Sequence, residues 1–178
     1  MSKTRKYIMR LSVTAALVAV TVVLARFCSI NLWNMSIGIS FVPIMLCGML
    51  FGPLWGGICG AAADFIGATL FPFGPYFPGF TAVAFISGVL FGFVGMGAGR
   101  LHSRWAFIGL TAAIITVDEI VCSILLNSLW ITLLYGSPYI PTMVARIPKA
   151  VLMLIIQVPV ALIIKQFIYN PVKRMLQN

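Results

Sequence analysis

Long apolar runs, separated by short breaks rich in glycine, proline or basic residues, make up most of the sequence. Most runs approach the ~20 residues that an α-helix needs to cross a bilayer. The predicted spans are residues 11–30, about 37–52, about 54–71, about 79–99, about 105–134 and about 142–169. The fifth is too long for an untilted span, so we expect it to tilt, kink or extend beyond the bilayer. The pattern predicts an all-α, polytopic membrane protein with six transmembrane helices, in a single membrane domain covering residues 1–178.

The first run has an alternative interpretation. A basic segment precedes residues 11–30, and Val23-Leu-Ala25 resembles the small-residue site of a cleavable signal peptide. The rest of the chain is equally apolar, however, and Arg26 would directly follow the cut. A retained first helix is therefore favoured.

Composition supports the membrane assignment. Hydrophobic residues make up 61% of the chain and charged residues 8%, whereas soluble domains have about 25% charged residues. This excludes a cytosolic enzyme, a disordered chain and a secreted disulfide scaffold. The 4 cysteines form no C-x-x-C pair and lie in or beside apolar runs, which is typical of small buried hydrophobic residues. A zinc site needs more ligands than the single histidine, His102, can supply.

The basic residues predict the orientation of the chain. There are 12 Lys and Arg residues but 3 Asp and Glu residues, which gives a net charge of +9. Nine of the basic residues flank the predicted spans: Lys3, Arg5, Lys6, Arg10, Arg100, Arg104, Lys165, Lys173 and Arg174. By the positive-inside rule both termini are cytoplasmic, and the loops near 29–37, 72–79 and 135–142 face outward. No basic surface remains for nucleic acid.

Six charged residues lie inside or close to the apolar spans: Arg26, Asp64, Asp118, Glu119, Arg146 and Lys149. Charges at membrane depth are costly and usually face a cavity or pair with one another. The three basic residues lie near the predicted outer ends, where no acid is found, so we expect an anionic ligand there; headgroup snorkelling is the alternative. A structural hydrogen bond or ion pair is the simplest role for Asp64. The two adjacent acids point about 100° apart on a helix and cannot serve one partner in the same way.

Residues 71–81 form the most distinctive segment, Phe-Pro-Phe-Gly-Pro-Tyr-Phe-Pro-Gly-Phe-Thr. Its three prolines restrict the backbone, so a rigid loop is predicted. Such a loop would hold Tyr76 and Phe77 in place to close over a flat aromatic ligand. The alternative is an aromatic belt at the membrane interface.

Small residues recur at intervals of four along several spans. The lines are Gly48, Gly52, Gly56 and Gly60; Ala84, Gly88 and Gly92; and Ala15 with Ala19. This spacing allows close approach of helix backbones, either within the bundle or at a docking face for another membrane protein. The chain has no phosphate-binding P-loop and no set of nucleophile, base and orienting residue, so neither ATP hydrolysis nor another enzymatic activity is expected.

Three segments carry a family resemblance. They are Gly48-Met-Leu-Phe-Gly-Pro-Leu-Trp-Gly-Gly57, Asp64-Phe-Ile-Gly67 and the loop at residues 71–81. Together they resemble the folate-specific substrate-binding (S) component of energy-coupling factor (ECF) vitamin transporters. The resemblance implies six helices in the cell membrane, folate bound near the outer side, and no cofactor. It also implies a membrane coupling subunit docked on the face of Ala15 and Ala19, with two cytoplasmic ATPase subunits supplying energy.

The resemblance assigns chemistry to the candidate residues. The expected ligand-binding residues are Arg26, Asp64, Tyr76, Phe77, Asp118, Glu119, Trp130, Arg146 and Lys149. One of the basic residues would pair with the glutamyl carboxylates, and the aromatic rings would stack on the pterin or benzoyl ring. One of the acids would accept hydrogen bonds from the pterin; the sequence does not choose among the three.

A proton-coupled secondary transporter of a small anionic vitamin is the rival hypothesis. Asp64 and the Asp118–Glu119 pair would then carry the protons. The sequence shows no inverted repeat of the kind that is usual in secondary transporters.

Overall fold

Helices form nearly all of the computed structural model, which describes residues 3–31, 36–72, 74–101 and 103–171. The elements are α1 (Lys3–Phe27), α2 (Phe41–Phe51), α3 (Pro53–Leu70), α4 (Pro78–Arg100), α5 (Arg104–Asp118), η1 (Glu119–Leu126), α6 (Asn127–Tyr135), α7 (Tyr139–Ile164) and η2 (Lys165–Tyr169). The π-helical segments η1 and η2 continue the helices before them, so Arg104–Tyr135 and Tyr139–Tyr169 are each unbroken. The helical class predicted from the sequence is confirmed.

Three details differ from the predicted elements. A short antiparallel ladder joins β1 (Ile30–Asn31) to β2 (Ser36–Ile37), so α2 begins only at Phe41 and is 11 residues long. The loop predicted over residues 71–81 is also shorter, because α4 begins at Pro78 and residues 78–81 are helical. The long fifth span is one unbroken helix that contains the π-helical segment η1. His102, Lys173 and Arg174 lie outside the described residues.

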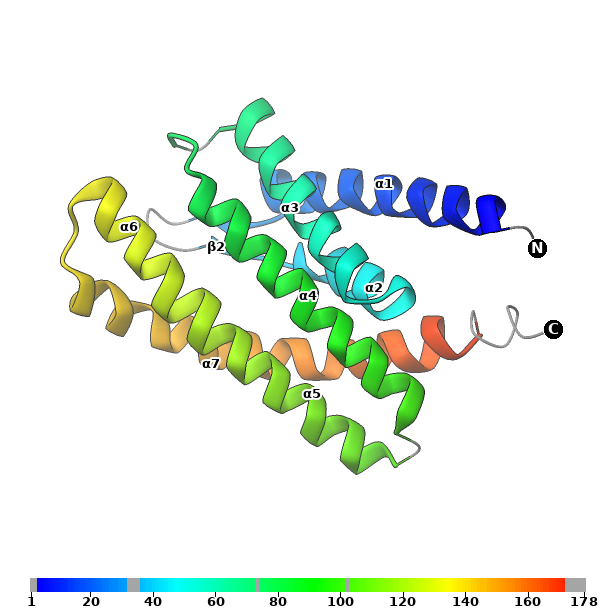
Figure 1. Ribbon diagram of the computed structural model, residues 1–178. Helices are drawn as coiled ribbons and strands as arrows, with labels where there is room; N and C mark the ends of the chain where they lie inside the picture. Colours follow the sequence, from blue (N-terminus) through cyan, green and yellow to red (C-terminus); the bar gives the residue numbers. More distant parts are fainter. Residues whose placement is uncertain (1–2, 32–35, 73, 102, 172–178) are drawn as a thin grey trace.

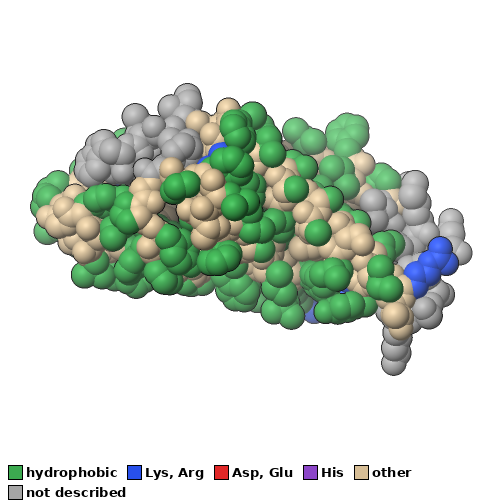
Figure 2. Space-filling view, turned by 90° about the horizontal axis from the view of Figure 1, so that it is seen from above, with side chains coloured by type: hydrophobic (Ala, Val, Ile, Leu, Met, Phe, Trp, Pro, Cys, Tyr) green, Lys and Arg blue, Asp and Glu red, His purple; other side chains and the backbone are tan. Residues whose placement is uncertain are grey.

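Four helices in the described part of the chain are long and apolar enough to cross a membrane. They are Thr4–Phe27, Pro78–Arg100, Arg104–Tyr135 and Tyr139–Tyr169. The helix Phe41–Phe51 is apolar but shorter. Figure 2 shows a face covered mainly by hydrophobic side chains, with few Lys and Arg side chains, the most prominent of them at the right-hand end. A surface of this kind is suited to lipid and not to water.

Glycine and proline set the helix boundaries. Gly52 has a φ of 98°, and Pro53 is the first residue of α3, so the chain turns sharply between α2 and α3. Gly136 ends α6 in the left-handed conformation with a φ of 67°. Pro78 begins α4, because its fixed φ suits a first helical position.

The small residues of α2, α3 and α4 pack against one another. A Cβ atom on Gly56 would collide with the carbonyl of Gly88, and one on Gly88 would collide with the carbonyl of Gly56. A Cβ atom on Gly48 would lie 2.8 Å from the backbone nitrogen of Gly92. These glycines therefore serve packing inside the bundle, whereas a Cβ atom on Gly52 would meet nothing and that residue serves the turn.

The helices are arranged so that the chain has two distinct ends. In Figure 1, α1 begins, η2 ends and α4 joins α5 at the right, while the α3–α4 and α6–α7 connections lie at the left. One buried cluster contains Met45, Phe91, Phe107 and Ile115 from α2, α4 and α5. A second cluster contains Val18, Val22, Cys47 and Cys59 and joins α1 to α2 and α3. Cys122 is also buried, but Cys28 is exposed, unlike the buried role predicted for all the cysteines.

Candidate ligand site

Asp64 on α3 is linked to the aromatic loop through a threonine. Thr81, in the first turn of α4, donates a hydrogen bond of 2.7 Å to Asp64 Oδ2. Its Oγ1 also lies 3.3 Å from the hydroxyl of Tyr76. Because the loop leads directly into α4, this contact fixes the loop relative to α3. The sequence pointed to the acid and the tyrosine but missed Thr81, whose only signal is a polar residue at the start of an apolar helix.

Arg26 lies in the last turn of α1 and against α3. A Cβ atom on Gly67 would lie 2.9 Å from Arg26 Nε, so this glycine leaves room for the guanidinium group. Asp64 lies three residues before Gly67 on the same helix, and its charge interacts with that of Arg26. The structure therefore brings together two of the predicted ligand residues from different helices.

The predicted aromatic residues divide into two groups. The ring of Phe77 lies 5.4 Å from that of Trp130 on α6, and both side chains are half-buried. Gly79 makes this pair possible, because a Cβ atom there would lie 2.7 Å from the Trp130 ring. Tyr76 packs its edge against Phe65 instead, at 5.7 Å between centroids, and stays 40% exposed. The loop thus presents aromatic surface to both α3 and α6.

A second charged group lies between α4, η1 and α7. Ser87 of α4 donates a hydrogen bond of 2.6 Å to Asp118, and Gln157 of α7 donates one of 3.2 Å to Glu119 Oε1. Both acids are only 6% exposed. The two adjacent acids therefore accept hydrogen bonds from different helices, although the charge of Lys149 interacts with both. Ser87 and Gln157 were not predicted, although each is a polar residue inside an apolar run.

Arg146 and Lys149 belong to this second group. Arg146 is 4% exposed and donates a hydrogen bond of 2.7 Å from Nη1 to the carbonyl of Ser123. The charge of Lys149 interacts with those of Glu119, Arg146 and Asp118. The prediction placed the two cations near the end of their helix, but α7 begins at Tyr139, so Arg146 lies about two turns inside it. Arg146 and Lys149 have acidic neighbours inside the bundle, so they are not cations of the protein surface alone.

Several buried polar atoms lack a hydrogen-bond partner among the described residues. They include Glu119 Oε2, Gln157 Oε1, Trp130 Nε1, Ser128 Oγ and Thr132 Oγ1. Burying such groups without partners is costly. Three of these residues lie on α6 and two belong to the second charged group.

Ala15 and Ala19 lie on a different surface. Both are exposed, and they line an apolar groove of about 540 Å³ between α1 and α3. The groove is lined by Leu11, Thr14, Ala15, Val18, Ala19, Val22, Val23, Trp55, Ile58, Ala62, Ile66, Leu70 and Phe71. The two alanines thus face outward and leave a shallow channel, as a docking surface would require.

Comparison with curated proteins identifies relatives that are named for one substrate. A protein of Clostridium novyi (strain NT), named folate transporter FolT, is 35% identical over 139 residues, which are 78% of this chain and 77% of that protein. A protein of the same name from Leuconostoc mesenteroides is 29% identical over 157 residues, 88% of this chain and 82% of that protein.

Comparison with solved structures gives a consistent result. The crystal structure of FolT bound with folic acid matches with a TM-score of 0.74 and 33% identity, covering 85% of this chain and 89% of that one. The S-component for biotin from an ECF-type ABC transporter matches with a TM-score of 0.66 and 18% identity, covering 93% and 95%. At that identity the second match shows the fold alone.

A family model completes the comparison. The model described as ECF transporter, substrate-specific component, matches residues 9–165, most of the chain. It covers α1 from Met9 onward, both charged groups and the aromatic loop. The family predicted from the sequence is confirmed: this chain belongs to the substrate-specific components of ECF transporters.

Proposed function

We propose that the chain binds folate with high affinity and is the substrate-specificity subunit of an ATP-driven folate uptake system. The observation that carries this proposal is the 33% identity and 0.74 TM-score with FolT bound with folic acid. The polar and aromatic groups of the site support it, because folate combines a flat pterin, a benzoyl ring and two carboxylates. The chain also presents cations, acids and aromatic rings within its apolar helices.

The geometry supports a division of roles in the site. Arg26 lies near the α3–α4 connection and would pair with the glutamyl carboxylates, in the bidentate manner that suits a guanidinium group. Tyr76, Phe77 and Trp130 would pack on the pterin or benzoyl ring. Glu119 Oε2 has no partner among the described residues and would accept hydrogen bonds from the pterin.

The remaining charged residues would then support the ligand-contacting ones. Asp64, held by Thr81, would orient Arg26. Arg146 and Lys149 would balance Asp118 and Glu119 in the interior. Trp130 follows Glu119 by eleven residues on one continuous helix. An elongated ligand such as folate could contact both places.

We place the chain in the cell membrane with six crossings and both termini in the cytoplasm. The proposed crossings are α1, the segment that contains the shorter helix α2, then α3, α4, the helix Arg104–Tyr135 and the helix Tyr139–Tyr169. The clustering of flanking basic residues supports this orientation. Ala15 and Ala19 would dock on a membrane coupling subunit that carries two cytoplasmic ATPase subunits.

The proposal is tested with the purified chain and with proteoliposomes. We expect folate to copurify and be identified by mass spectrometry, and the emptied protein to bind added folate. Uptake into proteoliposomes should require ATP and the partner module. Folate uptake by this chain alone, driven by a proton gradient, would instead support a secondary transporter.

A further inference from the structure

A cavity with a basic side and an apolar side lies at the end of the molecule opposite the aromatic loop. It has a volume of about 640 Å³ and is formed where α5 begins and η2 follows α7. Arg104, Trp105, Phe107, Ile108, Leu162, Lys165, Gln166 and Asn170 line it. Neither the ligand site nor the groove of Ala15 and Ala19 includes any of these residues.

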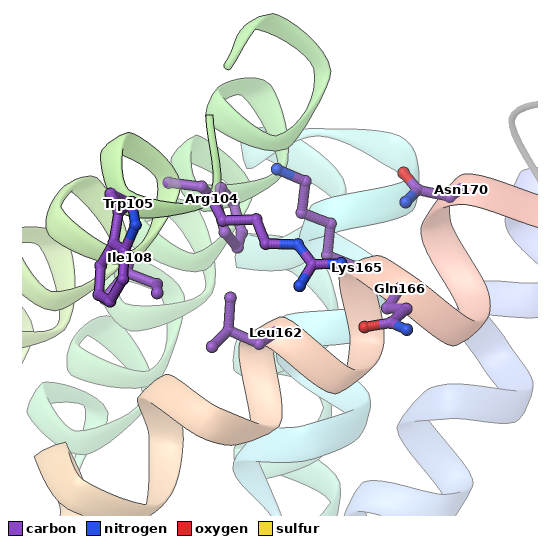
Figure 3. A pocket seen from close by; sticks show the side chains of 8 residues that line it. Arg104, Trp105, Ile108, Leu162, Lys165, Gln166 and Asn170 are labelled. Carbon is purple, nitrogen blue, oxygen red and sulfur yellow. The ribbon is translucent and has the colours of Figure 1, made fainter. Parts of the chain in front are cut away.

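The cavity is basic and polar at one side and apolar at the other. Figure 3 shows Arg104 reaching from α5 toward η2, which contains Lys165 and Gln166 and is followed by Asn170. Leu162 and Ile108 supply the apolar part. None of the chain's three acids, Asp64, Asp118 and Glu119, lines the cavity. The cations therefore have no acidic side chain of this cavity to balance them.

Lys165 is held in place before any ligand arrives. Its Nζ lies 3.8 Å from the centroid of the Phe107 ring and donates a hydrogen bond of 3.3 Å to the carbonyl of Leu101. Phe107 is fully buried, so the ring that contacts Lys165 is held in place by its neighbours. A cation positioned this way loses little conformational entropy on binding an anion.

The position of the cavity matches the headgroup level of a bilayer. Pro78–Arg100 and Tyr139–Tyr169 end here, and Arg104–Tyr135 begins here. Trp105 is 82% exposed beside Arg104, and exposed tryptophan next to basic residues is typical of a membrane–water interface. The first turn of α5, a 15-residue helix, adds the positive end of its dipole.

We propose that this cavity binds the phosphate headgroup of an anionic phospholipid. Arg104 and Lys165 contact the phosphate. The amide side chains of Gln166 and Asn170 form hydrogen bonds with the polar headgroup. Leu162 and Ile108 contact the glycerol and the first acyl carbons. Basic pockets between membrane helices are known to bind the headgroups of anionic lipids, and this cavity has the same basic character beside an apolar surface.

The test is native mass spectrometry of the purified chain in detergent. Phosphatidylglycerol and phosphatidylcholine with the same acyl chains are added at equal concentration. We expect the parent to retain phosphatidylglycerol preferentially, and Arg104→Gln and Lys165→Gln each to reduce that preference about fivefold. Arg10→Gln, an equal change of charge on an exposed part of α1, should leave the preference intact.

The controls separate the possible sources of the effect. Thermal unfolding of each variant identifies misfolding, and Lys165→Arg should restore the preference that Lys165→Gln lowers. Equal retention of the two lipids by the parent would overturn the proposal. So would an equal loss in Arg10→Gln, which would indicate a general surface charge effect. Displacement of the lipid by millimolar inorganic phosphate would assign the cavity to free phosphate instead.

Discussion

Individual side chains in the proposed folate site depend on partners from other helices. Asp64 is held by Thr81 and lies near Arg26, while Asp118 and Glu119 bind Ser87 and Gln157. Inside an apolar bundle these polar groups have no water to bind, so each contact compensates for the hydration that the group lost on folding. Removing one partner is therefore expected to cost more than the hydrogen bond alone.

Thr81→Val tests the support of Asp64. The variant keeps the shape of the side chain but removes the donor 2.7 Å from Asp64 Oδ2. We expect folate affinity to fall by about 1–3 kcal/mol, because the carboxylate would lose its orientation. Thr81→Ser should bind nearly as well as the parent. Thr116→Val is the matched control, since Thr116 bonds to the carbonyl of Ala112 in its own helix. Isothermal titration measures all three.

Arg26→Gln tests the contact with the glutamyl tail. Neutralising the cation should weaken folate binding by about 2–5 kcal/mol, because a desolvated carboxylate would lose its partner. Pteroate lacks the glutamate, so its affinity should change much less. Titrations of Arg146→Gln and Lys149→Gln with both ligands complete the comparison. If all three variants bind folate as tightly as the parent, the cations serve lipid headgroups or internal acids instead.

At the scale of elements, glycine decides how closely α3 and α4 approach. The carbonyls of Gly56 and Gly88 occupy the space that a Cβ atom on the opposite glycine would need. Without a strong hydrophobic driving force between membrane helices, such close contact supplies much of their attraction. The aromatic loop joins the end of α3 to the start of α4, so its position depends on the packing of these two helices.

Gly88→Ala is expected to destabilise the bundle. The added methyl group would collide with the backbone of Gly56 and force the helices apart, at a cost of about 1–3 kcal/mol. Gly109→Ala is the matched control, because a Cβ atom there would meet nothing within 4 Å. Thermal unfolding in detergent should show a lower midpoint for Gly88→Ala alone. An unchanged midpoint would mean that the helix pair can relax without loss.

The aromatic loop is a second element whose stiffness can be tested. Pro75 precedes the Tyr76–Phe77 pair, and Pro78 both follows it and begins α4. Replacing both prolines by glycine should weaken folate binding by about 1–2 kcal/mol through added freedom of the unbound loop. Tyr76→Ala and Phe77→Ala should cost more if either ring contacts the ligand. Unchanged folate affinity in every variant would indicate that the loop belongs to an aromatic belt at the membrane interface and does not bind the ligand.

At the scale of the whole molecule, α1 and α3 leave an apolar groove open to the membrane. Trp55 and Ile58 of α3 form one wall, and α1 forms the other with Ala15 and Ala19. The alanines keep the groove shallow enough for another helix to approach closely. The groove includes Phe71 but none of the proposed ligand-contacting residues, so docking and folate binding should be separable.

Ala15→Trp and Ala19→Trp should separate the two functions. A bulky ring would fill the groove, so transport by the assembled complex should be lost while the isolated chain still binds folate. Val20→Trp is the control: Val20 is exposed on α1 but does not line the groove. Folate titration and ATP-dependent uptake provide the two measurements. Loss of folate binding in the alanine variants would show that these residues pack internally.

The sequence by itself determined the helical membrane class and the family. Apolar runs of membrane length and a chain with 8% charged residues leave few other folds, because a soluble surface could not be built from them. The glycine and proline positions also marked the breaks near Gly52 and Gly136 correctly, whereas the predicted loop at residues 71–81 extended too far, because Pro78 begins α4. These features are local, so they can be read along one chain.

Only the tertiary structure decided which distant residues meet. It paired Phe77 with Trp130, linked Asp64 to Thr81, and grouped Arg146 and Lys149 with the buried acids. It also showed that most of the glycine lines pack internally, whereas Ala15 and Ala19 face outward. Helix periodicity gives the face of each residue, but the rotation and partners of each helix depend on packing among all of them.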